Sequence, residues 1–284
     1  MTSTRVERLR ATLSGLARRW LGIRALGHLV RFEPVLELIL SAAPSGTVLD
    51  VGSGSEGITT LLPPGWQATA LDADFVDYAP TASSPRLTPG QMLGDVRSMP
   101  FDDRTFDVVV AVDLLEHVLP VDRQRAVSEI CRVSRRRAVI ACPVGDAAFA
   151  ADQRLAERIA ARGRPAPGWL VEHLHHGFPE IRTITDTASR FGTIRVIGNE
   201  SVAAHERLVG AELTPITALG LRLISQPLQA LMSSRRCRAR RAAAVILKAI
   251  RGDDRTPTYR AVVAVDIAAA VAPSAPLTTS PARG

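Results

Sequence analysis

Lysine, aromatic residues and cysteine are all scarce in this chain of 284 residues, and each scarcity restricts what the protein can be. Lysine occurs once, at Lys248, so nearly all of the positive charge behind the formal net charge of +7 is arginine. Arginine with abundant alanine is typical of a GC-rich genome, so the basic composition does not by itself indicate a nucleic-acid partner. Aromatic residues make up 4% and apolar residues 46%, which predicts a folded chain with a core of mostly Ala, Val, Leu and Ile.

The three cysteines, Cys131, Cys142 and Cys237, are odd in number and have no C-x-x-C spacing. This argues against a disulfide framework or a structural zinc site, and it suits a reducing compartment. A secretory signal is not expected either, because arginines interrupt each apolar run near the start. They stand at positions 5, 8, 10, 18, 19 and 24. We therefore expect a cytoplasmic protein.

Apolar residues at helical spacing from Leu9 to Trp20 predict helix over residues 1–40, within an N-terminal helical cap of residues 1–44. After Pro44 the pattern changes to short apolar runs that alternate with helical stretches. This alternation predicts an α/β fold, a doubly wound, Rossmann-like, seven-stranded and mostly parallel sheet with helices on both faces. The predicted strands are Thr47–Gly52, Gln67–Ala73, Gln91–Gly94, Phe106–Leu114, Arg136–Val144, Thr193–Asn199 and Tyr259–Ile267.

Two segments are too long to be ordinary connections inside the domain expected over residues 45–271. Residues 145–180 are interpreted as a lid, and residues 202–256 as a basic helical insertion. The tail, residues 272–284, is rich in Pro, Ser and Thr and is predicted to be disordered.

The stretch "VLDVGSGSEG" combines a glycine-rich turn with acidic residues. Gly52, Gly54 and Gly57 have the G-x-G-x-x-G spacing that lets a backbone approach a ligand at a helix N-terminus. Asp50 and Glu56 would repel a phosphate but would favour a ligand with a cationic end. S-adenosylmethionine carries a sulfonium and an ammonium and has no phosphate.

Four ordered motifs support that interpretation: "VLDVGSGSEG", "ALDAD", "GDVRSMPF" and "FDDRTFDVVVAVDLLEH". With them, residues 45–145 resemble the class I S-adenosylmethionine-dependent methyltransferases of the small-molecule, type 11-like kind. The resemblance implies that Asp72 binds both ribose hydroxyls, that Asp95 and the Val96 backbone lie at the adenine, and that Asp113 faces the methionyl end. The cofactor-binding residues expected are Asp50, Gly52, Ser53, Gly54, Asp72, Ala73, Asp95, Val96 and Asp113.

Two alternatives belong to other functional classes. A nicotinamide-dependent oxidoreductase also has a glycine-rich turn and an acidic residue near the position of Asp72. Asp50, the Gly94-Asp95 pair and the "MPFDDRTFD" sequence argue against it. The other alternative is a methyltransferase-like domain that binds the cofactor without turnover.

The methyl acceptor is narrowed by motifs that the chain lacks. Nucleic-acid amino methyltransferases carry an Asn/Asp-Pro-Pro-aromatic motif where this chain has "VDLLEH". Cytosine C5 enzymes need a cysteine near a proline, but Cys142-Pro143 has the wrong order for them. Protein-arginine enzymes use two glutamates after the fourth strand, and Glu116 is only one. We therefore expect methylation of oxygen on a small, glycan-linked or lipid-linked acceptor, with no nucleic-acid partner.

The segment "WLVEHLHHGFPE" in the expected lid contains the candidate catalytic residues. A histidine there could deprotonate a hydroxyl, with a glutamate orienting it. The alternative is that these residues only pack and hydrogen-bond. The candidates are Glu172, His173, His175 and His176. No metal site is expected, because adjacent His175 and His176 point apart on a helix; His117 is interpreted as a structural or pocket-wall residue.

Residues 213–251 carry an apolar stretch followed by "SSRRCRARR". Arg222 and Pro227 argue against a membrane span. Two helices are predicted, one started by Thr214-Pro215 and one running from near Pro227 to Ile250. They would form the outer wall of the acceptor pocket, or they would lie peripherally on the inner face of the membrane, assisted by the basic helix at residues 5–31. The arginines for that contact are Arg235, Arg236, Arg238, Arg240 and Arg241.

Overall fold

The computed structural model describes residues 25–54, 57–75, 89–212, 215–252 and 257–269. Its centre is a seven-stranded sheet in the order β3-β2-β1-β4-β5-β7-β6. The strands are β1 (Gly46–Val51), β2 (Trp66–Asp72), β3 (Gln91–Leu93), β4 (Phe106–Val112), β5 (Ser134–Pro143), β6 (Gly192–Ser201) and β7 (Thr258–Ile267). β7 pairs antiparallel with β5 and β6, and the other pairs are parallel. All seven predicted strands are present, and the predicted fold class is confirmed.

The described helices stand before β1 and between the strands from β4 to β7. They are α2 (Ala25–Ala42), α3 (Arg123–Val133), α4 (Gly145–Ala160), α5 (Gly168–His176), α6 (Ile181–Ala188), α7 (Val202–Glu212), α8 (Pro215–Met232) and α9 (Cys237–Arg251). Two short 3-10 turns, η1 (Ile58–Leu61) and η2 (Pro120–Asp122), complete the order.

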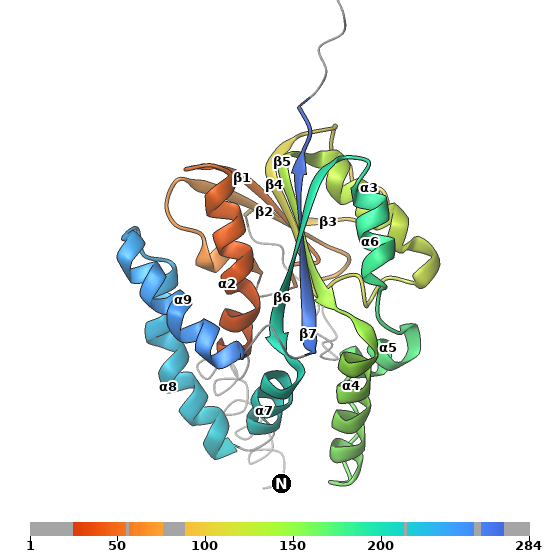
Figure 1. Cartoon of the computed structure of the whole chain (residues 1–284), viewed down its shortest axis with the longest axis vertical. Coiled ribbons are helices and arrows are strands. Elements are labelled where there is room, and N and C mark those ends of the chain that lie inside the picture. Colours follow the sequence, from red (N-terminus) through yellow and green to blue (C-terminus); the bar gives the residue numbers. More distant parts are fainter. Residues whose placement is uncertain (1–24, 55–56, 76–88, 213–214, 253–256, 270–284) are drawn as a thin grey trace, which may run out of the picture.

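β4 is buried along its whole length, as its apolar run predicts. Its side chains alternate between two cores: Val108 and Val110 belong to one, and Val109 to the other. The first core is covered by α2, α8 and α9, and the second by α3 and α6, so helices flank both faces of the sheet (Figure 1). This layered packing fixes the strands that position the site.

Three helices lie beyond the edge of the sheet where the parallel strands end. Figure 1 shows α4, α5 and α7 at the lower end of the sheet, on the side where β6 runs into α7. α4 and α5 pack on each other through a small apolar cluster of Leu155, Ile159 and Leu170. The predicted lid segment is therefore folded as helices at the edge where open α/β sheets bind ligands.

The insertion between β6 and β7 differs from its prediction. The described part of residues 213–251 holds the two predicted helices, α8 and α9, after α7, but α8 runs through Pro227, where a break was predicted. A proline lacks the amide donor for the carbonyl four residues earlier, at Leu223. Leu223 and Pro227 are both exposed, so water can hydrate that carbonyl, while Leu228 and Met232 on the buried face hold the helix in place. The predicted break at Pro227 is therefore wrong.

Other predictions about the chain's organisation lie wholly or partly outside the described residues. Helix is found over Ala25–Ala42, whereas residues 1–24, Glu56, Thr214 and the tail 272–284 lie outside the described part of the chain. The domain boundaries at 44 and 45 stay predictions. Within the described ranges, none of the helices has the length and the apolar character to cross a membrane.

Candidate active site

The glycine turn after β1 has the backbone that its sequence requires. Gly52 and Gly54 have φ angles of +69° and +53°, a region that L side chains rarely adopt. The buried Asp50 Oδ2 accepts a hydrogen bond of 2.7 Å from the Ile58 amide beyond the turn. A Cβ at Gly57 would overlap this carboxylate. Asp50 and the three glycines therefore fix the shape of the turn.

Asp50 itself does not reach the ligand side of the turn. It is 1% exposed and is absent from the lining of the adjacent cavity. Burial raises the pKa of Asp50 to about 7. The Asp50 carboxylate is turned back toward Ile58 and organises the turn, and its part in cofactor binding stays a prediction.

Asp72 joins the turn to the end of β2. Its Oδ2 accepts a hydrogen bond of 2.8 Å from the Gly54 amide, and its side chain lines the cavity. The contact also places the Gly54 backbone beside this carboxylate. A ligand with a vicinal diol could use the same carboxylate as an acceptor.

The cavity has a volume of about 970 Å³ and lies at the carboxyl ends of β1, β2, β3 and β4. It brings together eight of the nine residues predicted for cofactor binding, all except Asp50. These eight are Gly52, Ser53, Gly54, Asp72, Ala73, Asp95, Val96 and Asp113. A volume of this size suits a ligand pocket that holds two reactants.

Asp95 is exposed and already paired. Its carboxylate accepts hydrogen bonds of 3.0 and 2.7 Å from Nε and Nη2 of Arg97, which also donates to Asp122 at 2.8 Å. The hydrogen bonds from Arg97 lower the pKa of Asp95. Asp95 therefore stays ionised at the rim of the cavity.

Asp113, directly after β4, has a φ angle of +50° and turns its carboxylate into a cluster of arginines. Arg260 donates to Oδ2 at 2.7 Å through Nη2, and Arg31 Nε lies 3.0 Å from the same oxygen. Burial raises the pKa of Asp113, but the two guanidinium groups outweigh it and hold the pKa well below its usual range. β7 and α2 are thus tied to the end of β4 at this point.

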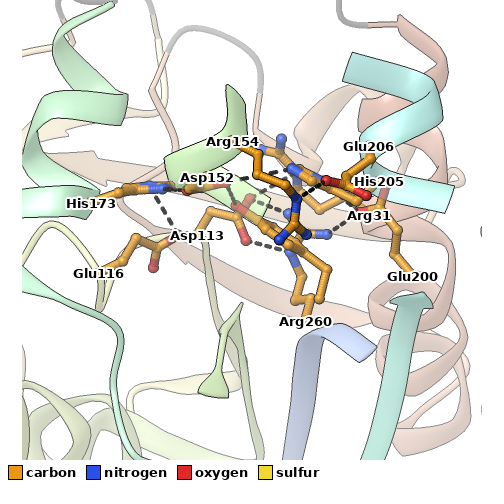
Figure 2. Close-up of polar contacts among 11 residues, drawn as sticks. Arg31, Asp113, Glu116, Asp152, Arg154, His173, Glu200, His205, Glu206 and Arg260 are labelled. Atoms are coloured by element: carbon orange, nitrogen blue, oxygen red, sulfur yellow. Dashed lines mark hydrogen bonds and ion pairs between the residues drawn. The ribbon is translucent and has the colours of Figure 1, made fainter. Parts of the chain in front are cut away.

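A second polar cluster continues from Arg260 through Glu200, His205 and Asp152 to His173 (Figure 2). Asp152 on α4 accepts hydrogen bonds of 2.6 Å from His173 Nδ1 and 3.0 Å from the Tyr259 hydroxyl. The His205 ring stacks on Tyr259 with centroids 3.4 Å apart. Contacts with His173 and His205 outweigh burial and lower the pKa of Asp152, which keeps it an anion. This network holds α4, α5 and α7 to β7.

His117 and Glu116 lie next to this network. His117 Nδ1 is 2.8 Å from Glu172 Oε2, and both His117 and His173 line the cavity. Glu116 is fully buried, with Oε1 3.9 Å from His173 Nε2. Glu116, His117 and His173 each offer a possible ligand atom, and these atoms lie within 4.8 Å of one another.

Comparison with known families identifies the domain that holds these residues. Residues 49–142 match a family model described as a methyltransferase domain. The chain carries a methyltransferase domain. The matched range runs from the middle of β1 almost to the end of β5 and contains each of the eight cavity-lining residues predicted for the cofactor. The expected S-adenosylmethionine-dependent methyltransferase, an enzyme with S-adenosylmethionine as methyl donor, is thereby confirmed over the nicotinamide alternative.

Several solved structures resemble the fold at low identity. The PH0226 protein of Pyrococcus horikoshii is 19% identical, with 61% of this chain and 84% of that chain covered and a TM-score of 0.41. Phosphoethanolamine N-methyltransferase 2 of Haemonchus contortus is 14% identical, with 88% and 57% covered and a TM-score of 0.45. A TehB-like methyltransferase of Corynebacterium glutamicum is 25% identical, with 48% and 75% covered and a TM-score of 0.34. A search of curated proteins found no match.

The four candidate catalytic residues of the methyltransferase separate into two groups. His173 lines the cavity and Glu172 contacts His117 there, whereas His175 is exposed and His176 lies in a different small pocket with Arg123. Glu172 therefore does not orient His176, although the two are four residues apart on α5.

The methyltransferase cavity also contains residues that the sequence did not single out. Arg31, Glu200, His205, Tyr259 and Arg260 carry no motif, and they come from four elements, with Asp152 on α4 behind Tyr259. The expected wall from α8 and α9 is absent from the described lining, where α2 and α7 contribute instead. Only the close spacing of Asp113, Glu116 and His117 in "DLLEH" could have drawn attention to this end of the cavity.

Proposed function

We propose that this methyltransferase transfers the methyl group of S-adenosylmethionine to an oxygen atom of a small acceptor bound in the cavity. The observation that carries the proposal is a pair of imidazoles, His117 and His173, that line the cavity and are each held by a carboxylate. Their distances to Glu172 and Asp152 are 2.8 and 2.6 Å.

The donor and acceptor would occupy different ends of the cavity. The resemblance assigns the ribose to Asp72 and the adenine to the region of Asp95 and Val96, all at the ends of β2 and β3. Asp113 and His117 follow β4, on the other side of β1 from β2 and β3. The acceptor then lies on the side of α5 and α7, and its reacting atom points toward the methionyl end of the donor.

Oxygen is the acceptor atom that best explains the imidazoles. A hydroxyl attacks the sulfonium methyl efficiently only when its proton is removed, and positioned histidines do this near neutral pH. A carboxylate on Nδ1 favours the tautomer that leaves Nε2 as the proton acceptor. In the reaction the new O–C bond forms as the S–C bond breaks, and S-adenosylhomocysteine leaves as a neutral thioether.

Turnover on paired acceptors tests the proposal. Hydroxyl compounds and their amine analogues are incubated with the full chain and S-adenosylmethionine, and the methylated atom is identified by mass spectrometry and NMR. We expect O-methyl products. His173→Gln should lower kcat while S-adenosylmethionine affinity holds, and His175→Gln, on the exposed side of the same helix, serves as the matched control. Exclusive N-methylation, or equal turnover in both variants, would contradict the proposal.

The second candidate for the methyl acceptor is a lipid-linked molecule. A glycan-linked molecule without a lipid would be the soluble alternative. α8 and α9 expose several large apolar side chains, Leu219, Leu223, Ile224, Val245 and Ile246, which are 44–72% exposed. Next to them Arg235, Arg236, Arg238 and Arg241 are exposed. Apolar residues beside arginines suit a peripheral contact with an anionic membrane, on the cytoplasmic face in this proposal.

A further inference from the structure

Glu116 is a buried acid whose carboxylate has no hydrogen-bond partner among the described residues, although His173 Nε2 lies 3.9 Å away. It is 0% exposed, and neither oxygen has a hydrogen-bond partner in the described part of the chain. A buried, unpaired polar group is unfavourable unless something compensates it. The structure therefore points to a bound group at this carboxylate.

Each of the two histidines beside Glu116 is held by a carboxylate at its Nδ1 atom. His173 Nδ1 lies 2.6 Å from Asp152, and His117 Nδ1 lies 2.8 Å from Glu172. A carboxylate on one ring nitrogen fixes the imidazole and directs the lone pair of the other nitrogen, which is the arrangement found around metal-binding histidines. His173 Nε2 faces Glu116 Oε1 at 3.9 Å. Imidazoles and acid thus converge on one point.

We propose that Glu116, His117 and His173 bind one divalent transition-metal ion, with zinc as the preferred ion. Their ligand atoms lie within 4.8 Å of one another, so an inward movement of the side chains would bring all three into contact with the ion. Two imidazoles and one carboxylate suit zinc and its first-row neighbours, whereas magnesium and calcium prefer oxygen ligands. The ion neutralises Glu116.

The position of the cluster gives the ion a role in methyl transfer, and this step rests on the proposed function. His117 and His173 line the cavity, so the coordination position left open by three protein ligands faces the acceptor. An acceptor hydroxyl bound there loses its proton to solvent more readily, because the cation stabilises the alkoxide. The oxygen then takes the methyl group from sulfur. With the ion bound, Nε2 of His117 and His173 is occupied, so the ion takes over the activation of the hydroxyl that the proposed function otherwise gives to the imidazoles, and the proton goes to solvent.

Metal binding can be measured without turnover. The full chain is freed of metal with a chelator and titrated with Zn²⁺ against a chromophoric competitor, and with Co²⁺ by visible absorption. We expect one equivalent to bind. Glu116→Gln should weaken zinc binding about a hundredfold or more, because it replaces a ligand. Glu172→Gln removes only a carboxylate that orients His117 and should weaken zinc binding about 10- to 100-fold. Glu157→Gln, an exposed glutamate on α4, is the matched control and should bind as wild type does.

Circular dichroism and thermal melting identify any variant that fails to fold, and His117→Ala then replaces it. Equal affinity in wild type and Glu116→Gln, or no binding to wild type, would overturn the metal site. Full O-methyl turnover by chelator-treated, metal-free protein would also overturn it and leave the proposed function intact. Specific metal binding with methylation on nitrogen would support the site and contradict the proposed function.

Discussion

At the scale of single residues, Asp72 joins the glycine turn to the end of β2 and is the residue proposed to bind the donor ribose. Its Oδ2 already accepts from the Gly54 amide, so in this proposal the side chain stabilises the turn and also offers a charge to the ribose. Replacing it with alanine would remove both contacts. Asparagine is the sharper substitution, because its carbonyl can still accept from Gly54 whereas its amide cannot accept from a hydroxyl.

We predict that Asp72→Asn weakens S-adenosylmethionine binding roughly ten- to hundredfold in a folded protein. Hydrogen bonds to a charged group contribute about 1.5–3 kcal/mol, which corresponds to that range. Isothermal titration calorimetry gives the dissociation constant. Asp102→Asn, an exposed aspartate away from the cavity, is the control. An unchanged dissociation constant for Asp72→Asn would remove this residue from the donor site.

We predict that Asp50 makes the stability of the fold depend on pH, because burial raises its pKa from 3.8 to about 7. Between these values the folded chain keeps a proton that the unfolded chain has lost, so stability falls as pH rises through this window and levels off above it. Asp50→Asn should lack this fall, a difference of roughly 4 kcal/mol at most. Urea unfolding without ligand, from pH 4 to pH 8, measures it. Parallel stability curves for wild type and variant would contradict the assignment.

At the scale of elements, the strands could be predicted and the helix boundaries could not. β4 can be recognised from its own sequence, because a strand that is buried on both faces of a sheet is a continuous apolar run. The continuity of α8 through Pro227 depends on the packing of Leu228 and Met232 against distant residues, which local sequence does not reveal. Tertiary packing thus overrode the helix-breaking tendency of proline.

The polar cluster at α4, α5 and α7 shows the same limit for the site. Asp152 contacts residues 21 and 107 positions away in the chain, and it has no motif of its own. Cavity-lining residues such as Asp72 could be located from the sequence because they stand at fixed points of an ordered set of motifs. Asp152, His173 and His205 come from helices whose relative placement is set by the complete fold.

We predict that Asp152→Ala destabilises these helices. The substitution leaves the buried Tyr259 hydroxyl and His173 Nδ1 without their acceptor, and each unsatisfied buried group costs about 1–3 kcal/mol. Urea unfolding should show a loss in that range or above it, with unchanged m-value. Asp146→Ala, exposed in the first turn of the same helix, should lose less than about 1 kcal/mol. Equal losses in the two variants would mean that the network contributes little.

At the scale of the whole molecule, the cavity is closed by parts of the chain that lie far apart in sequence. Arg260 on β7 binds Asp113 after β4 and Glu200 at the end of β6, while Arg31 on α2 approaches the same aspartate. Helices α8 and α9 pack on α2 without lining the cavity. Their outer surface is therefore available for a role separate from catalysis.

We predict that this outer surface binds vesicles containing anionic lipid at low salt and releases them at high salt. Each arginine near such a surface contributes about 1 kcal/mol, and salt screens that attraction. Co-sedimentation of the full chain measures binding. Replacing the five arginines of the SSRRCRARR segment with glutamine should abolish it. Those residues are Arg235, Arg236, Arg238, Arg240 and Arg241.

The control must remove the same charge from another surface. Exposed arginines elsewhere, at positions 162, 164, 182, 190 and 195, allow a variant with five glutamines and an equal net charge. If binding follows net charge alone, both variants lose it equally, and no membrane-facing surface is defined. A membrane-facing surface is defined if only the variant of the SSRRCRARR segment loses vesicle binding. If Leu223→Asn also weakens vesicle binding at every salt concentration, the apolar and basic parts of α8 and α9 act together. That result would favour a lipid-linked acceptor, while absence of binding at low salt would favour a soluble one.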